Sequence, residues 1–270
     1  MPTLSPQANA IAIAVLGVVS FALSLLVRRL VPDRPDFDAG PWSATLSYIA
    51  TAYGIVVGFW ILFLFGLFAD SRQAVGDEAT SIGTAFEEVA LFPDGAPDVR
   101  RALICYAEAI VEYEWPALEE GASAPEADLA YREIVLALGA IDEPFGSTLG
   151  PAAATNIFVQ VGDISTARET RLVAAETPTP ALMWALLVGG GALVAALIFI
   201  VAHRSAPVTQ AVQVSLTVLF TSVMIALVAA LTNPFAPGAG RVTPELIEQT
   251  RATMQAAAPE LVADDCIFES

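Results

Sequence analysis

Residues 45–69 read TLSYIATAYGIVVGFWILFLFGLFA, 25 consecutive positions without an Asp, Glu, Lys or Arg. A helix rises 1.5 Å per residue, so about 20 apolar residues cross the roughly 30 Å of hydrocarbon in a bilayer. Three further stretches meet this criterion: Ala10–Val27 with 18 residues, Ala181–Ala202 with 22 and Val208–Leu231 with 24. Buried helices of soluble proteins are normally shorter and carry a polar face. The sequence therefore predicts an integral membrane protein with four transmembrane helices.

The first stretch is expected to be a retained membrane helix. No Lys or Arg precedes it, and Arg28-Arg29 follow it where a cleaved signal peptide would have small residues.

The predicted fold class is all-α, with a helical extramembrane bundle inserted between the second and third membrane helices. We expect transmembrane helices 1 and 2 in residues 1–69 and the acidic extramembrane domain in residues 70–180. Transmembrane helices 3 and 4 should occupy residues 181–232, and a tail with a short helix residues 233–270. No part of the chain alternates with period two for long enough to predict a sheet.

The second hydrophobic helix is expected to leave the membrane without a break, because no proline lies between Trp42 and Pro93. Beyond the bilayer, apolar residues recur every three or four positions, at Val75, Ala79, Ile82, Phe86 and Val89, and the carboxylates Asp77, Glu78, Glu87 and Glu88 lie off this stripe. Three more helices are predicted in the insertion: Asp98–Glu114, ended by Trp115-Pro116, then Glu126–Leu138 and Pro151–Glu176.

The charge of the chain is strongly negative and unevenly distributed. The formal net charge is −17, with 12 Arg and no Lys, and residues 70–180 hold 20 Asp and Glu against 6 Arg, a net charge of −14. Nucleic-acid binding requires a basic surface, so a nucleic-acid partner is excluded. Cys105 and Cys266 are expected to remain unpaired thiols, with a single bridge as the alternative.

The sequence contains few residues suited to catalysis or metal binding, so we expect no enzymatic activity, no cofactor and no metal. The single histidine, His203, belongs to a short loop at the membrane boundary. Glu108, Glu112 and Glu119 lie near one helical face, but di-metal bundles also need histidines and the insertion has none, so a solvated acidic face is the interpretation. Gly189-Gly190-Gly191 lies inside an apolar span and predicts close helix packing rather than a phosphate loop.

One face of the second membrane helix changes from small to bulky residues along its length. Small and bulky side chains in this order could line a pore that narrows to a hydrophobic constriction, which gates by dewetting. The alternative is that Gly54-x-x-x-Gly58 packs against another helix while the phenylalanines contact lipid. The pore-lining candidates are Ser47, Thr51, Gly54, Gly58, Ile61, Phe65 and Phe68.

The fourth membrane helix carries a polar stripe at spacings of three and four residues. Polar side chains in hydrocarbon must bond to a neighbour or face water, so the stripe predicts an interior face. Hydrogen bonding between helices and the lining of a conduit both remain open. The stripe consists of Gln210, Gln213, Thr217 and Thr221.

Several motifs resemble those of a known family. A glycine-containing hydrophobic helix that runs from Gly58-Phe59 into Ser71-Arg72-Gln73-Ala74-Val75-Gly76 resembles the pore-helix region of bestrophin channels, as does Asn233-Pro234-Phe235 after the fourth span. The order of these motifs, together with three others, resembles the bestrophin-like family of bacterial four-span membrane proteins with no assigned function. The three others are Glu114-Trp115-Pro116, Ala167-Arg168-Glu169-x-Arg171-Leu172 and Pro180-x-Leu182-x-Trp184.

The resemblance implies a homopentamer whose second spans surround an axis, with the insertion and both termini in the cytoplasm, where the thiols would stay reduced. The density of Arg28, Arg29, Arg34 and Arg204 in the short loops favours the opposite orientation. The insertion side carries as many arginines near the membrane ends, at Arg72, Arg168, Arg171 and Arg241, so the cytoplasmic placement is the expectation. Animal bestrophins carry a calcium-binding acidic run after Asn-Pro-Phe, whereas residues 236–241 here contain no carboxylate, so calcium gating is not expected.

Two functional hypotheses follow. The first is passive ion conduction through a homo-oligomeric pore in the inner membrane of a bacterial cell, with a monovalent cation favoured by the acidic domain. The second is a non-conducting membrane scaffold or accessory subunit whose acidic bundle binds a partner.

Overall fold

The structure is a computed structural model that describes residues 6–30, 39–92, 96–141, 150–177, 179–238, 240–261, 266 and 268. All regular secondary structure in these residues is helical. The chain divides into two compact units. Unit 1 comprises Met1–Gly66 and Pro178–Thr232, and unit 2 comprises Leu67–Thr177 and Asn233–Ser270.

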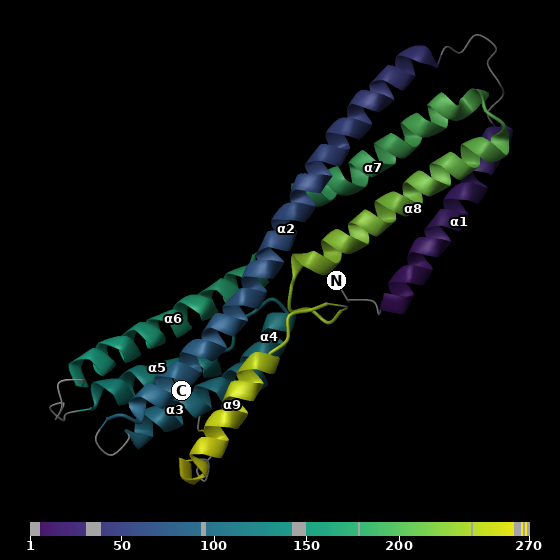
Figure 1. The fold of residues 1–270 in the computed structure, drawn as a ribbon. Helices are drawn as coiled ribbons and strands as arrows, with labels where there is room; N and C mark the ends of the chain where they lie inside the picture. The colour runs from purple at the N-terminus through teal and green to yellow at the C-terminus, as the bar shows by residue number, and fades with distance from the viewer. Residues whose placement is uncertain are drawn as a thin grey trace. The chain divides into compact units, whose positions relative to one another are not determined.

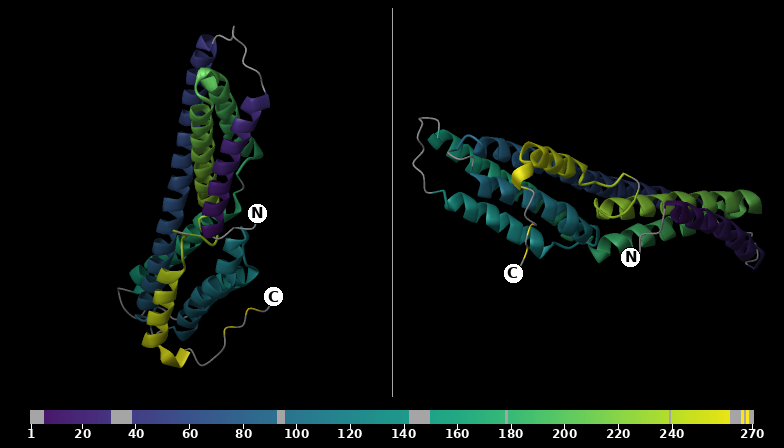
Figure 2. Two further views of the ribbon diagram at one scale, coloured as in Figure 1. Left: turned by 90° about the vertical axis from the view of Figure 1, so that its right-hand side faces the viewer. Right: turned by 90° about the horizontal axis from the view of Figure 1, so that it is seen from below.

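Unit 1 holds the four predicted membrane helices, each long and apolar enough to cross a bilayer. They are α1 (Pro6–Leu30), the first part of α2 (Gly40–Val89), α7 (Ala181–Val201) and α8 (Pro207–Thr232). A short 3-10 helix, η3 (Ala202–Arg204), connects α7 to α8 and contains His203. α8 packs against both α1 and α7 (Figures 1 and 2). The prediction of four transmembrane helices is therefore confirmed in length and composition.

Two glycines of α7 allow its close approach to α2 and α8. A Cβ atom on Gly190 would lie 2.5 Å from Cδ2 of Tyr53, and one on Gly191 would lie 2.3 Å from Cγ2 of Thr221. The Tyr53 hydroxyl donates a hydrogen bond of 2.9 Å to the Leu187 carbonyl on α7. The prediction that this glycine run permits helix packing is confirmed at two of its three positions, since nothing lies within 4 Å at Gly189.

Unit 2 is a helical bundle with an apolar core. The rest of α2 is joined there by α3 (Pro97–Ala109), the π-helix η2 (Ile110–Glu114), α4 (Trp115–Glu119), α5 (Pro125–Gly139), α6 (Gly150–Glu176), α9 (Glu245–Ala257) and the 3-10 helix η4 (Pro259–Leu261). α5 and α9 both pack on α3. All five members of the predicted apolar stripe on α2 are buried in this core, so that prediction is confirmed: Val75, Ala79, Ile82, Phe86 and Val89.

The helix that starts at Pro97 does not end at Trp115-Pro116, contrary to the prediction. The chain continues through η2 into α4, which ends at Glu119. The amide of Trp115 donates to the carbonyl of Ile110, the wider spacing of a π-turn. Pro116 then falls in the first turn of α4, where a missing N–H is tolerated. The predicted helices at 126–138 and 151–176 are confirmed to within one residue at each end.

The expectation of two unpaired thiols was wrong. Cys105 on α3 and Cys266 after η4 form a disulfide, with their Cα atoms 5.5 Å apart. The two residues are separated by 161 positions. They meet because the segment after α9 returns to α3, where Leu261 and Phe268 pack against the core of unit 2.

Glu78 also differs from expectation. It lies off the apolar stripe of α2 in sequence, yet its side chain is completely buried. The reason is an ion pair with Arg171 of α6, whose side chain is equally buried.

Candidate functional site

Much of the predicted pore face of α2 is exposed. Ser47, Thr51, Gly54, Gly58 and Phe65 are exposed. Among the described residues, no atom lies within 4 Å of a Cβ placed on Gly54 or Gly58, apart from the helix itself. The glycine pair therefore does not mediate helix packing inside unit 1, which leaves lipid, water or another copy as its neighbour.

The last two members of this face are partly covered. Ile61 is half-buried against an apolar cluster of unit 1 that contains Leu64 and Leu187. Phe68 belongs to unit 2 and is half-buried against the core of that bundle. Of the three bulky candidates, Phe65 is the most open, with 59% of its surface exposed.

An adjacent face of α2 is occupied by α7 and α8. Val57 and Leu64 are buried together with Leu187 of α7 and Val228 of α8, and Tyr53 bonds to α7 as described above. α2 is thus fixed on one side and free on the side that carries the small residues.

The polar stripe of α8 is divided between two environments. Gln210 is completely buried and donates a hydrogen bond of 2.6 Å to the carbonyl of Phe199. Thr221 lies against Gly191 of α7. Gln213 and Thr217 instead line a groove of about 440 Å³ next to Ser205. The first two residues link helices, and the other two remain accessible to small polar molecules.

A buried network of charged residues lies in the core of unit 2. Arg171 Nε donates to Glu78 Oε2 at 2.6 Å, and its Nη2 donates to Glu78 Oε1 at 2.9 Å and to Glu114 Oε2 at 3.3 Å. Arg168, one turn earlier on α6, donates to Glu114 Oε1 at 2.9 Å and to Asp128 Oδ1 at 2.6 Å. Two arginines thus pair with two buried carboxylates, Glu78 and Glu114, and with the more exposed Asp128. These ion pairs join α2, η2, α5 and α6.

The electrostatics of this network follow from burial and charge. Burial raises the pKa of Glu114, and the charges of Arg171 and Arg168 offset only part of that rise. Burial raises the pKa of Tyr106 well above its ordinary value, and the adjacent negative charge of Glu78 adds to the effect. Tyr106 therefore stays protonated and donates a hydrogen bond of 2.6 Å to Glu78 Oε1. Burial acts to lower the pKa of Arg168, but the negative charges of Glu114 and Asp128 leave it raised overall, so the guanidinium remains charged.

The Asn233-Pro234-Phe235 motif stabilises the end of α4. The Asn233 amide donates to the carbonyls of Leu118 and Glu119, at 3.1 and 3.3 Å, in the last turn of α4. Its Oδ1 accepts a hydrogen bond of 2.9 Å from the Phe235 amide. The Phe235 ring is fully buried and packs edge-on against Trp115, with ring centroids 5.5 Å apart. In unit 2 this motif is therefore part of the folded core.

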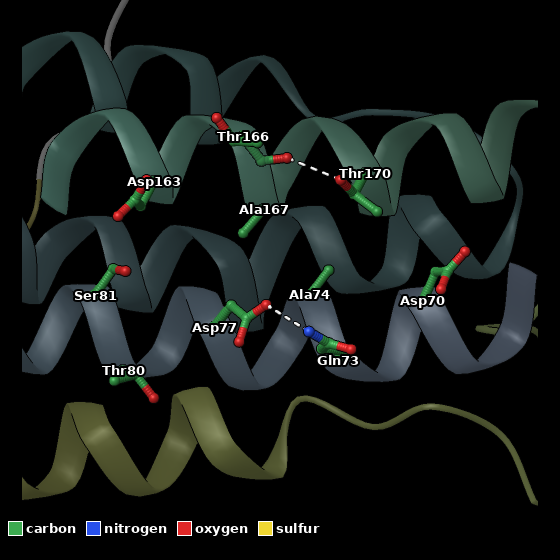
Figure 3. A pocket seen from close by; sticks show the side chains of 10 residues that line it. All are labelled: Asp70, Gln73, Ala74, Asp77, Thr80, Ser81, Asp163, Thr166, Ala167 and Thr170. Carbon is green, nitrogen blue, oxygen red and sulfur yellow. Dashed lines mark hydrogen bonds between the residues drawn. The ribbon is translucent and has the colours of Figure 1, made fainter. Parts of the chain in front are cut away.

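An open polar groove of about 490 Å³ lies between α2 and α6 of unit 2. Figure 3 shows side chains of both helices lining it, with three carboxylates, Asp70, Asp77 and Asp163, spread along its length. The carboxylates are interspersed with hydroxyl groups, among them Thr166 and Thr170 of α6. Within the described residues no three Asp, Glu, His or Cys side chains are grouped closely enough to hold a metal ion. The groove therefore presents an acidic, open surface.

The sequence of this chain matches a known family of membrane proteins. The sequence profile of the Bestrophin-like domain matches residues 12–247, nearly the whole chain. The chain belongs to the Bestrophin-like family. No curated protein matches it in sequence.

Solved structures support the same fold for this bestrophin-like chain. A bacterial bestrophin homologue from Klebsiella pneumoniae, in a tryptophan-to-alanine variant, superposes with a TM-score of 0.70 at 14% identity, over 95% of this chain and 99% of that chain. An isoleucine-to-threonine variant of that homologue gives a TM-score of 0.66 at 14% identity, covering 93% and 97%. A structure described as a membrane protein, in a leucine-to-alanine variant, gives 0.71 at 11% identity, covering 93% and 99%. At such identities the likeness establishes the fold.

The buried charge network was not predicted from the sequence. Glu114, Arg168 and Arg171 were noted only as parts of bestrophin-like motifs, and no pairing among them was predicted. An arginine at a position in register with Ile157, Val161 and Ile164 was the available signal, because a cation on a buried face requires a buried anion.

Proposed function

We propose that this bestrophin-like chain is a subunit of a passive ion channel in which α2 of each copy lines a common axis. The observation that carries the proposal is the unoccupied face of α2, where Ser47, Thr51, Gly54 and Gly58 are exposed and no atom approaches the two glycines. Small residues at these positions leave room for water and ions around an axis. The family resemblance suggests five copies.

The bulky residues of the same face form the proposed constriction. Ile61, Phe65 and Phe68 follow the small residues at spacings of three and four positions. A ring of such side chains, one from each copy, expels water when it is narrow and admits water when it is widened or made polar. Conductance should therefore depend on the size of the side chain at position 65.

Planar-bilayer recordings of purified protein test this proposal. Phe65→Ala is expected to raise the single-channel conductance. Phe59→Ala is the matched control, because Phe59 is comparably exposed, at 69% against 59%, but lies off the proposed pore face. If the wild type and both variants pass no current while the oligomer stays intact, the chain is instead a non-conducting scaffold or accessory subunit.

We propose a monovalent cation as the permeant ion. Residues 70–180 carry a net charge of −14, and an acidic mouth concentrates cations over about a Debye length, roughly 8 Å at physiological ionic strength. Reversal potentials in asymmetric potassium chloride should shift toward the potassium equilibrium potential, and a shift toward that of chloride would refute the assignment. Glu87→Gln, at an exposed position of α2, tests whether this helix contributes to the field, with Glu133→Gln on α5 as the control.

The proposed location is the inner membrane of a bacterial cell, with lipid around unit 1. Two observations disagree on which side of the membrane unit 2 faces. The family resemblance suggests the cytoplasm, whereas the loop arginines suggest the outer side. The disulfide is a feature of this chain itself and favours the outer side.

A further inference from the structure

The C-terminal segment is attached to unit 2 at two neighbouring points. Cys266 is bonded to Cys105 of α3, and the ring of Phe268 packs edge-on against Tyr113 of η2, with centroids 5.5 Å apart. Cys105 and Tyr113 are eight positions apart on one continuous helical stretch, about two turns. Cys266 and Phe268 therefore lie along α3 and η2, held by a covalent bond and an aromatic contact.

The surroundings of the cysteine pair differ from those of a redox sensor. Sensor cysteines favour the thiolate through nearby Lys, Arg or His and are freely accessible. In sequence Cys266 directly follows Asp264-Asp265 and is followed closely by Glu269, while Arg101 lies one helical turn before Cys105 on α3. Both cysteines are half-buried. These features fit a lasting structural disulfide better than a pair that opens and closes repeatedly.

A lasting disulfide depends on the compartment in which it forms. Such bonds persist in the bacterial periplasm and at the cell surface, and they are rare in the cytosol, where thiols are kept reduced. With four crossings, the segment after α2 that contains Cys105 and the segment after α8 that contains Cys266 lie on the same side of the membrane. The Cys105–Cys266 disulfide thus assigns both segments to the same compartment.

The arginines of the short loops agree with this assignment. If unit 2 lies outside, residues 28–44 and 203–207 lie in the cytoplasm with Arg28, Arg29, Arg34 and Arg204. Short cytoplasmic loops are enriched in arginine and lysine, and no Lys or Arg precedes α1 on the other side. We propose that the acidic unit 2 faces the oxidising, extracytoplasmic side of the membrane and that the Cys105–Cys266 disulfide anchors the C-terminal segment there.

This orientation also determines which mouth of the pore is acidic, an inference that rests on the proposed function. The residues with a net charge of −14 would then surround the external mouth of the pore and would attract cations from outside the cell. The orientation itself does not depend on conduction.

Accessibility labelling of the full chain in bacterial spheroplasts tests the orientation. Free thiols are first blocked with N-ethylmaleimide, the disulfide is reduced with a membrane-impermeant phosphine, and the new thiols are labelled with an impermeant polyethylene-glycol maleimide that shifts the protein on a gel. The wild type is expected to gain two tags per chain after reduction and none before it. Cys266→Ser, labelled without the N-ethylmaleimide block, should gain one tag without reduction, because Cys105 is left free.

Two single-cysteine variants separate orientation from disulfide formation. In a chain lacking both native cysteines, Thr253→Cys on the exposed face of α9 should be labelled in spheroplasts, whereas Ser205→Cys in the loop between α7 and α8 should be labelled only after permeabilisation. Labelling of Thr253→Cys only after permeabilisation would overturn the proposal. So would full blocking of the wild-type thiols by N-ethylmaleimide before reduction. Neither result bears on whether the protein conducts, so the two proposals can fail separately.

Discussion

Arg171 and Glu78 form a bidentate ion pair inside unit 2, with contacts of 2.6 and 2.9 Å, although 93 positions separate them in the sequence. Both side chains are completely excluded from solvent. The pair connects α6 to the part of α2 that lies in unit 2, and Glu114 of η2 contacts the same guanidinium. The Arg171 guanidinium also lies 5.6 Å from the centre of the Trp115 ring, which adds a cation–π contact.

Arg171→Met should destabilise unit 2 strongly. Removal of one partner of a buried ion pair leaves the other charge unpaired and typically costs about 3–5 kcal/mol. Unfolding in detergent, with hydrogen exchange of α3 and α6 peptides, measures the effect. Glu78→Gln combined with Arg171→Met should be less destabilised than Arg171→Met alone, because no buried charge is stranded at position 78. Arg132→Met, at an exposed position of α5, is the control, and an equal loss in both single variants would contradict the assigned role.

Tyr106 should make unit 2 sensitive to alkaline pH. Its pKa is raised in the folded protein by burial and by the charge of Glu78. Below a pH of about 10, the ordinary pKa of tyrosine, the residue is protonated in both states and its contribution to stability is fully present. Above that pH the unfolded chain loses the proton while the folded chain keeps it, so the free energy of unfolding falls as pH rises.

The matching variant is Tyr106→Phe. It should lose this alkaline dependence, and at neutral pH it should cost about 1–3 kcal/mol because Glu78 loses its 2.6 Å hydrogen bond. Denaturant titrations at several pH values between 7 and 11 measure both effects. Tyr113→Phe, which removes a partly exposed phenol, should keep the wild-type pH dependence. An unchanged alkaline slope in Tyr106→Phe would show that another group is responsible.

Gly191→Ala should loosen the packing of unit 1. The added methyl group would lie 2.3 Å from Thr221 and 3.2 Å from the Tyr53 hydroxyl, so neighbouring side chains or helices must move. Overpacking of this kind costs about 1–3 kcal/mol. Gly189→Ala on the same helix meets nothing within 4 Å and serves as the control. Thermal stability in detergent should fall only for the first variant, and equal stability of the two would contradict the close contact.

Gly58→Val should affect conduction without affecting the fold of the protomer. Nothing lies within 4 Å of the position where the new side chain begins, so the change in unfolding free energy should stay within about 0.5 kcal/mol. In the proposed pore, five isopropyl groups would narrow the axis and lower the single-channel conductance. Unaltered conductance, with an intact oligomer, would place this face against lipid and not on the pore.

The distribution of sequence features along the chain was enough to predict much of the fold. Spans such as 45–69 are recognisable because crossing a bilayer requires an uninterrupted local run of apolar residues. The buried stripe of α2, from Val75 to Val89, is likewise recognisable because helical periodicity is a local property. The bestrophin-like motifs identified the family for the same reason, since each is a short contiguous pattern.

The candidate site was only partly predictable. The small-residue face of α2 could be drawn from the positions of Ser47, Thr51, Gly54 and Gly58, but the sequence left open whether another helix covers it. In the described residues this face stays exposed, because α7 and α8 cover an adjacent face of α2 that carries Tyr53 and Val57. That outcome depends on which helices pack together, and no local pattern records it.

The sequence by itself determined the membrane class, the helical content, the acidic character of residues 70–180 and the family. Only the tertiary structure decided that Glu78 is buried against Arg171, that Cys105 is joined to Cys266 and that Pro116 lies within a continuing helical stretch. The physical reason is the range of the interactions. Hydrophobic spans and amphipathic stripes depend on neighbours within a few turns, whereas an ion pair across 93 positions and a disulfide across 161 exist only once the chain has folded back on itself.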